Sequence, residues 1–154
     1  MQALADRLGI ADAVVWRTNI PIAELRAALG SATAGLHTMW NEHFGIGVVE
    51  MMAAGVITIA HNSGGPRADI VVRFRGTPTG LLAAEASEYA DALEVVFTPG
   101  ALPLRAMAVA ARASVARFSD GEFQLQFTAC LIRLLTDGRA TALARRAGGA
   151  GGRA

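Results

Sequence analysis

The sequence predicts an α/β domain in which a partial parallel sheet is flanked by helices and followed by C-terminal helices. Short apolar runs at residues 13–16 and 56–60 are typical of buried parallel strands, and residues 34–38 leave a short strand between them. Segments with helical spacing separate these runs, and glycines stand where those helices end. The 154 residues are enough for one ordinary domain with a hydrophobic core.

The amino-acid composition limits which partners and which stabilising bonds we expect. Hydrophobic residues make up 53% of the chain and charged residues 18%, so we expect buried helices or a face that meets another surface. The net charge of +1 points away from nucleic acid or another polyanion as a partner. Cys130 is the single cysteine, so an internal disulfide is excluded and no cysteine metal site is readable.

The first third of the chain predicts helix, strand and helix in that order. Residues 2–8 carry leucines four positions apart, and the apolar run 13–16 predicts the first strand. Pro21 fits the first position of a helix over residues 22–29. Ligands bind at the carboxyl ends of strands in open α/β sheets, so Asn19 becomes a candidate edge of a ligand site. An ordinary loop role is the alternative.

Residues 36–55 hold the stretch around which the chain is organised. We expect a strand end, a crossing loop and then a helix that Gly45 or Ile46 opens and a glycine ends. Glu42 then lies in the loop just before the helix, and Glu50 lies inside the helix, after about one turn.

This geometry predicts a site for a nucleotide sugar. A helix N-terminus offers unpaired N–H groups and partial positive charge, which favour a phosphate. Gly45 and Gly47 have no Cβ, so a ligand can approach the backbone closely. Carboxylates accept hydrogen bonds from hydroxyls, so Glu42 and Glu50 suit a sugar and a ribose. Alternatively, Glu42 complements the helix dipole and Glu50 is an exposed helix charge.

Three histidines, His37, His43 and His61, fall near the carboxyl ends of predicted strands. No His-x3-His or comparable ligand spacing is present, so we expect no metal and favour hydrogen-bonding roles. His43 directly follows Glu42 and is the strongest candidate of the three.

A second loop, residues 61–66, follows the strand at 56–60. Its glycine pair, Gly64 and Gly65, lets backbone N–H groups converge on an anion, which predicts a loop that faces the nucleotide sugar. A simple turn is the alternative. Residues 79–83 then predict a short edge strand.

The remainder is predicted to be helical, over residues 88–97, 104–118 and from Ser119. The arginines in this part are most simply a solvated face. They are Arg105, Arg112 and Arg117. The last helix has a wide apolar stripe that must pack on something. We expect an ordered domain over residues 1–135 and a disordered tail, rich in Ala, Gly and Arg, over residues 136–154.

The spacing Glu42-x7-Glu50 carries a family resemblance. With His43-Phe44-Gly45 after the first glutamate and Met52-Ala53-Ala54-Gly55 after the second, it resembles the donor-site motif of retaining GT-B glycosyltransferases of family 4. Residues 35–50 and 61–66 are similar to members that transfer mannose from GDP-mannose to a dolichol-linked oligosaccharide. The resemblance runs from about residue 2 to residue 135 and covers the later part of the donor domain.

The resemblance implies a Rossmann-like C-terminal, donor-binding half of a GT-B fold and α-1,2 mannosyl transfer with retention. It implies that Glu50 accepts hydrogen bonds from the ribose and that Glu42, as the catalytic-site residue, orients the transferred sugar. Backbone N–H groups of Phe44, Gly45 and Ile46 would hold sugar and phosphate oxygens. Members need no metal or other cofactor as a rule.

The resemblance also implies a partner and a place. The acceptor is a lipid-linked oligosaccharide reached through an N-terminal domain outside these residues, at the cytosolic face of the endoplasmic reticulum membrane. The chain itself contains no predicted membrane span, and we expect it alone to be soluble. A nucleotide-sugar binding module, or an inactive fragment without turnover, is the alternative function.

Overall fold

A three-stranded parallel sheet forms the centre of the molecule in the computed structural model, which describes residues 1–148 and the side chains of residues 1–137. The strands lie in chain order, and Ala34 pairs with Ile57 while Ile59 pairs with Leu81. Their bounds are β1 (Ala34–His37), β2 (Ile57–His61) and β3 (Leu81–Ala83). The expected partial parallel sheet is thus confirmed, with β3 as a short edge strand.

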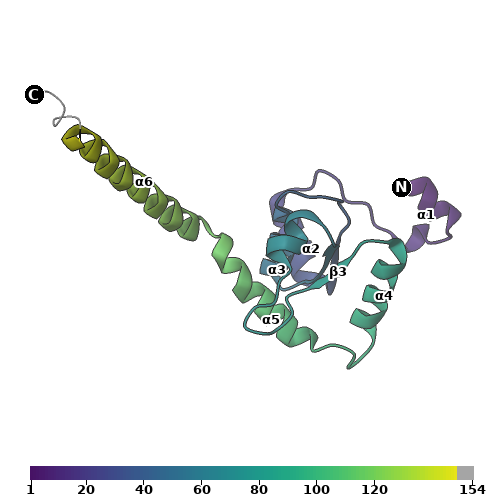
Figure 1. The fold of residues 1–154 in the computed structure, drawn as a ribbon. Helices are drawn as coiled ribbons and strands as arrows, with labels where there is room; N and C mark the ends of the chain where they lie inside the picture. Colours follow the sequence, from purple (N-terminus) through teal and green to yellow (C-terminus); the bar gives the residue numbers. More distant parts are fainter. Residues whose placement is uncertain (149–154) are drawn as a thin grey trace, which may run out of the picture.

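Six α-helices surround and extend this sheet in the described part of the chain (Figure 1). They are α1 (Gln2–Arg7), α2 (Ile22–Ser31), α3 (Ile46–Ala54), α4 (Ala86–Phe97), α5 (Leu104–Ser114) and α6 (Asp120–Gly148). Short helical turns are η1 (Ala11–Ala13), η2 (Pro66–Ile70) and η3 (Val115–Phe118). The helix predicted within the central stretch is confirmed as α3.

The core is divided between the two faces of β2, because successive side chains of a strand point to opposite faces. Ile57 and Ile59 pack with side chains from α4 and α5 on one face. Ala60 packs with side chains from α3, η2 and α5 on the other. Residues 56–60 are all buried, as an apolar central strand requires.

The prediction of a first strand at residues 13–16 is wrong. Those residues follow the turn η1, and Val14 has extended dihedral angles, φ −112° and ψ 120°. However, Val15 and Trp16 are 77% and 44% exposed, and the sheet of the described residues contains no fourth strand. An apolar run predicts a strand only where a neighbouring strand is available to pair with it.

Two arginines that we expected on a solvated face are exposed and also bind backbone carbonyls. The Arg112 guanidinium donates from Nε to Ala53 O at 3.1 Å and from Nη2 to Ala54 O at 2.7 Å. These carbonyls belong to the last turn of α3, where the helix leaves acceptors unpaired and favours a cation. Arg117 likewise donates to the backbone oxygens of Asp69 and Ile70.

Helix α6 extends away from the sheet, and α1 lies on the other side of the molecule (Figure 1). The apolar side chains of α6 up to residue 137 remain exposed, among them Phe123 at 66% and Leu134 at 64%. The helix continues to Gly148, which differs from the disordered tail expected from residue 136; residues 149–154 lie outside the described part. Alanine and arginine have high helix propensity, which explains the extension. Within the described residues no helix is both long and apolar enough to cross a membrane.

Candidate functional site

Two loops meet at the carboxyl ends of β1 and β2. The first follows His37 and leads to Gly45 at the start of α3, and the second follows His61 and leads to Gly65 before η2. Because β1 and β2 are parallel neighbours, both loops emerge at the same edge of the sheet. This is the edge at which the sequence predicts a ligand site.

Hydrogen bonds tie these two loops together. The Gly65 N–H donates to the Glu42 carbonyl oxygen at 2.7 Å, and the Asn41 N–H donates to Ser63 Oγ at 2.8 Å. Ser63 Oγ is also 2.8 Å from Nδ1 of His61. The backbone on both sides of Glu42 is therefore fixed by the neighbouring loop.

The glycine pair of the second loop makes this contact possible. A Cβ at Gly64 would lie 2.2 Å from the Glu42 carbonyl oxygen, and one at Gly65 would lie 2.4 Å from the Phe44 carbonyl oxygen. Gly64 also has a left-handed φ of 54°. The visible role of these glycines is close packing of two backbones, and the Gly65 N–H that we expected to face an anion is bonded to Glu42. Donor binding by Gly64 and Gly65 stays a prediction.

Helix α3 begins at this edge, as predicted. Gly45 is its N-cap residue with φ 103°, a left-handed conformation that favours glycine, and its carbonyl oxygen accepts from Val48 N at 3.0 Å. The first N–H groups of the helix have no intrahelical acceptor and point toward the edge of the sheet. Beside them, Ile46 is 68% exposed, and Phe44 packs edge-to-face against Phe118 with ring centroids 5.3 Å apart.

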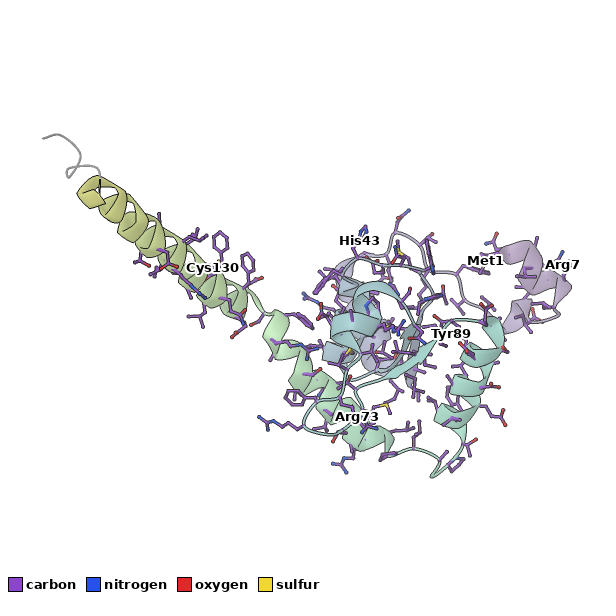
Figure 2. The ribbon with its side chains drawn as sticks, viewed as in Figure 1. Met1, Arg7, His43, Arg73, Tyr89 and Cys130 are labelled. Atoms are coloured by element: carbon purple, nitrogen blue, oxygen red, sulfur yellow. The ribbon has the colours of Figure 1, made fainter. Side chains whose placement is uncertain are left out.

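The Glu42 side chain is partly buried beside a histidine. Its side chain is 25% exposed, and Oε2 lies 4.0 Å from Nε2 of His37, whose side chain is 18% exposed. His43, the histidine that we ranked highest, is exposed at the rim of the domain (Figure 2). Sequence reasoning placed His37 near a strand end and did not single it out. No group of residues in the described part could hold a metal ion.

Tyr89 of α4, which comes much later in the sequence, supports the same end of β1. Its hydroxyl donates to the His37 carbonyl oxygen at 3.0 Å, across a separation of 52 residues. Burial of this side chain raises the pKa of the Tyr89 phenol. Sequence reasoning gave Tyr89 only a helical packing position, and no sequence signal identifies the strand end it reaches.

Glu50 has different surroundings. It lies on the second turn of α3, is exposed, and lines an open cleft of about 410 Å³ between α3 and α2. The cleft also contains Arg26 and apolar side chains of α2, including Leu25. Asn19 precedes α2 with a left-handed φ of 54°, which asparagine tolerates. No hydrogen bond or ion pair in the described residues joins Asn19 to either glutamate.

The arrangement is a helix N-terminus with one carboxylate before it and one within the helix. The partly buried Glu42 lies in the loop that precedes α3, and the exposed Glu50 lies on its second turn, where it lines a cleft that is mainly apolar. Such a site can hold an anion on the N–H groups while the carboxylates accept hydrogen bonds from hydroxyls. An apolar cleft with few polar groups suits a flat ring.

Comparison with known proteins agrees with this geometry. Residues 1–108 match the family model described as "Glycosyl transferases group 1". The chain is 48% identical over 134 residues to a Homo sapiens protein named GDP-Man:Man(3)GlcNAc(2)-PP-Dol alpha-1,2-mannosyltransferase, covering 87% of this chain. A Xenopus tropicalis protein of the same name is 50% identical over 129 residues, or 84% of this chain. The chain spans 27% and 26% of the length of these two relatives.

A solved structure confirms the fold. Sucrose-phosphate synthase from Thermosynechococcus elongatus superposes with a TM-score of 0.73 at 24% sequence identity, covering 88% of this chain and 34% of that protein. At this identity the match concerns the fold alone. The predicted Rossmann-like half and the predicted family resemblance are both confirmed.

Proposed function

The chain belongs to the group 1 glycosyl transferase family, and on that premise we propose that it forms the donor-binding part of a retaining α-1,2-mannosyltransferase. In this proposal the donor is GDP-mannose, and the acceptor is a dolichol-linked oligosaccharide. The names of the relatives at 48% and 50% identity support this choice of substrates.

One observation carries the proposal. Glu42 precedes α3 at the carboxyl edge of the sheet and Glu50 lies on the second turn of the same helix, in the spacing that the family motif leads us to expect. A helix N-terminus favours the diphosphate of a nucleotide sugar, and the two carboxylates provide acceptors for the hydroxyls on either side of it.

Each residue then has a distinct role. Glu50 accepts hydrogen bonds from the ribose hydroxyls, and the base lies toward the loop that contains Asn19. Glu42 orients the mannose through its hydroxyls, while N–H groups at Phe44, Gly45 and Ile46 hold sugar and phosphate oxygens. His43 lies at the rim of this donor site, and Asn19 lies at the base side.

The chemistry in this proposal is positioning and charge stabilisation. The site holds the anomeric carbon where an acceptor hydroxyl can reach it, which lowers the entropic cost of reaction. The N–H groups of α3 stabilise the negative charge that develops on the leaving diphosphate. The acceptor approaches from a surface outside these residues, and the lipid part of the acceptor supports a reaction at a membrane. We place that reaction at the cytosolic face of the endoplasmic reticulum.

Calorimetric titration with GDP-mannose tests the proposal, with UDP-glucose as the control ligand. We expect binding of GDP-mannose that is weakened about tenfold in Glu50→Gln, because hydrogen bonds to a charged acceptor are lost. Glu94→Gln removes the same charge from an exposed position on α4 and should bind as the unmodified chain does. Absence of GDP-mannose binding, or unchanged affinity in Glu50→Gln, would overturn the assignment.

A further inference from the structure

We propose that His37 is a positioning residue. It directs the carboxylate of Glu42 toward the transferred sugar. This inference rests on the proposed function, because it assumes that Glu42 contacts the sugar of the donor. The role of His37 concerns binding of the sugar alone, and binding of the nucleotide does not depend on it.

The His37 ring occupies a confined position between Glu42 and α3. Its Nε2 lies 4.0 Å from Oε2 of Glu42, and only 18% of its side chain is exposed. A Cβ added at Gly47 would lie 4.0 Å from Cδ2 of the ring, which places the ring against the first turn of α3. The ring therefore lies between the helix that would hold the diphosphate and the carboxylate that would hold the sugar.

The surroundings of the ring select one tautomer. Nδ1 is buried and has no hydrogen-bond partner among the residues that the structure describes. A buried N–H without an acceptor carries a large desolvation cost, so the neutral ring avoids a proton on Nδ1. The proton then resides on Nε2, the nitrogen that faces Glu42. His37 is thus an N–H donor directed at the carboxylate.

Both partners have fixed backbones. The His37 carbonyl oxygen accepts from the Tyr89 hydroxyl at 3.0 Å, and His37 pairs with Ala60 in the sheet. The Glu42 carbonyl oxygen accepts from Gly65 N–H at 2.7 Å. A separation of 4.0 Å between Nε2 and Oε2 is too long for a hydrogen bond, so the two side chains must approach each other for His37 to donate to Glu42. This approach would leave the second carboxylate oxygen of Glu42 to accept from the sugar.

The inference predicts an effect confined to the sugar. His37→Leu removes the donor and should weaken GDP-mannose binding about fivefold while GDP binding stays within twofold. His37→Gln places an amide nitrogen near the position of Nε2, so it should restore most of the affinity for GDP-mannose. Parallel titrations of both variants with GDP and GDP-mannose, with thermal melts as the folding control, give this comparison.

Different results would overturn the proposed function and the positioning role of His37. If the unmodified chain fails to bind GDP-mannose, the proposed function is wrong. If the chain binds GDP-mannose and His37→Leu weakens GDP and GDP-mannose equally, or neither, the positioning role is overturned.

A ligand-free measurement tests the same geometry independently. NMR correlation spectra of the imidazole nitrogens distinguish the two neutral tautomers of a histidine. We expect the signals of His37 to show the proton on Nε2. A proton on Nδ1 would remove the donor that faces Glu42 and would contradict the inference.

Discussion

The two glutamates of the site lie in regions that differ in how firmly they are held. On the Glu42 side, hydrogen bonds from Gly65 and between Asn41 and Ser63 join two loops whose backbones touch. On the Glu50 side, an open cleft of about 410 Å³ separates α3 from α2, a helix without a fully buried residue. One half of the site is packed against the sheet, and the other half is open.

This difference suggests a division of labour. A carboxylate on a loop that is held in place by a neighbouring loop needs little reorganisation, so the Glu42 side is suited to fix the reacting sugar. A cleft bordered by a lightly packed helix can adjust its width, so the Glu50 side is suited to admit a base and a ribose.

Gly65→Ala should have the largest effect, because a Cβ there would lie 2.4 Å from one backbone oxygen and 2.5 Å from another. These atoms cannot move without shifting the Glu42 loop. We expect a loss of about 2–3 kcal/mol in the free energy of unfolding, the range typical of overpacking. Chemical denaturation measures it. Unchanged stability would mean that the two loops are not firmly packed.

Tyr89→Phe should weaken the same side more modestly. The variant removes the hydroxyl that donates to the His37 carbonyl oxygen and keeps the ring, which is only 9% exposed. The expected cost is about 1 kcal/mol, the usual value for one hydrogen bond. Denaturation of this variant beside Gly65→Ala ranks the two supports of the strand end, and an equal or greater loss in Tyr89→Phe would reverse that ranking.

Gly30→Ala provides the matched glycine substitution on the open side. Gly30 lies inside α2, and a Cβ there would meet nothing within 4 Å. Alanine should therefore stabilise the chain by about 0.5–1 kcal/mol through its higher helix propensity. A destabilised variant would show that α2 is more tightly packed than the contrast between the two sides requires.

The smallest effect should come from Glu88, which caps α4 beyond the end of β3. Hydrogen bonds from the Ala84 and Glu85 backbone N–H groups hold the pKa of the Glu88 carboxyl below its usual value of 4.5. A lowered pKa in the folded state means that the carboxylate stabilises the fold above that value and loses the effect as pH falls. Melting temperatures of Glu88→Gln should therefore fall slightly less than those of the unmodified chain on acidification. Parallel curves would contradict this.

Sequence reasoning succeeded where the signal was local. Helix α3 begins after Gly45 and ends before Gly55, as expected, and both glycines are left-handed. The β-branched run of residues 56–60 forms most of the buried strand β2. Sequence reasoning failed at residues 13–16, because an apolar run carries no information about whether a strand lies beside it.

The rest of the site depends on contacts between distant segments. Gly64 and Gly65 looked like an anion-binding turn, and only the fold shows that they lie against the backbone of Glu42. Arg112 is exposed, as a surface charge should be, and only the fold shows that it also binds the carbonyls at the end of α3. His37 gains its place beside Glu42 only when the loop folds back over the strand end.

The division of labour between the two glutamates is tested most directly by titrating Glu42→Gln and Glu50→Gln with GDP and with GDP-mannose. We predict that Glu50→Gln weakens both ligands by a similar factor of about ten, whereas Glu42→Gln weakens GDP-mannose alone. Equal weakening of GDP and GDP-mannose by Glu42→Gln, or an effect of Glu50→Gln on GDP-mannose only, would contradict the account.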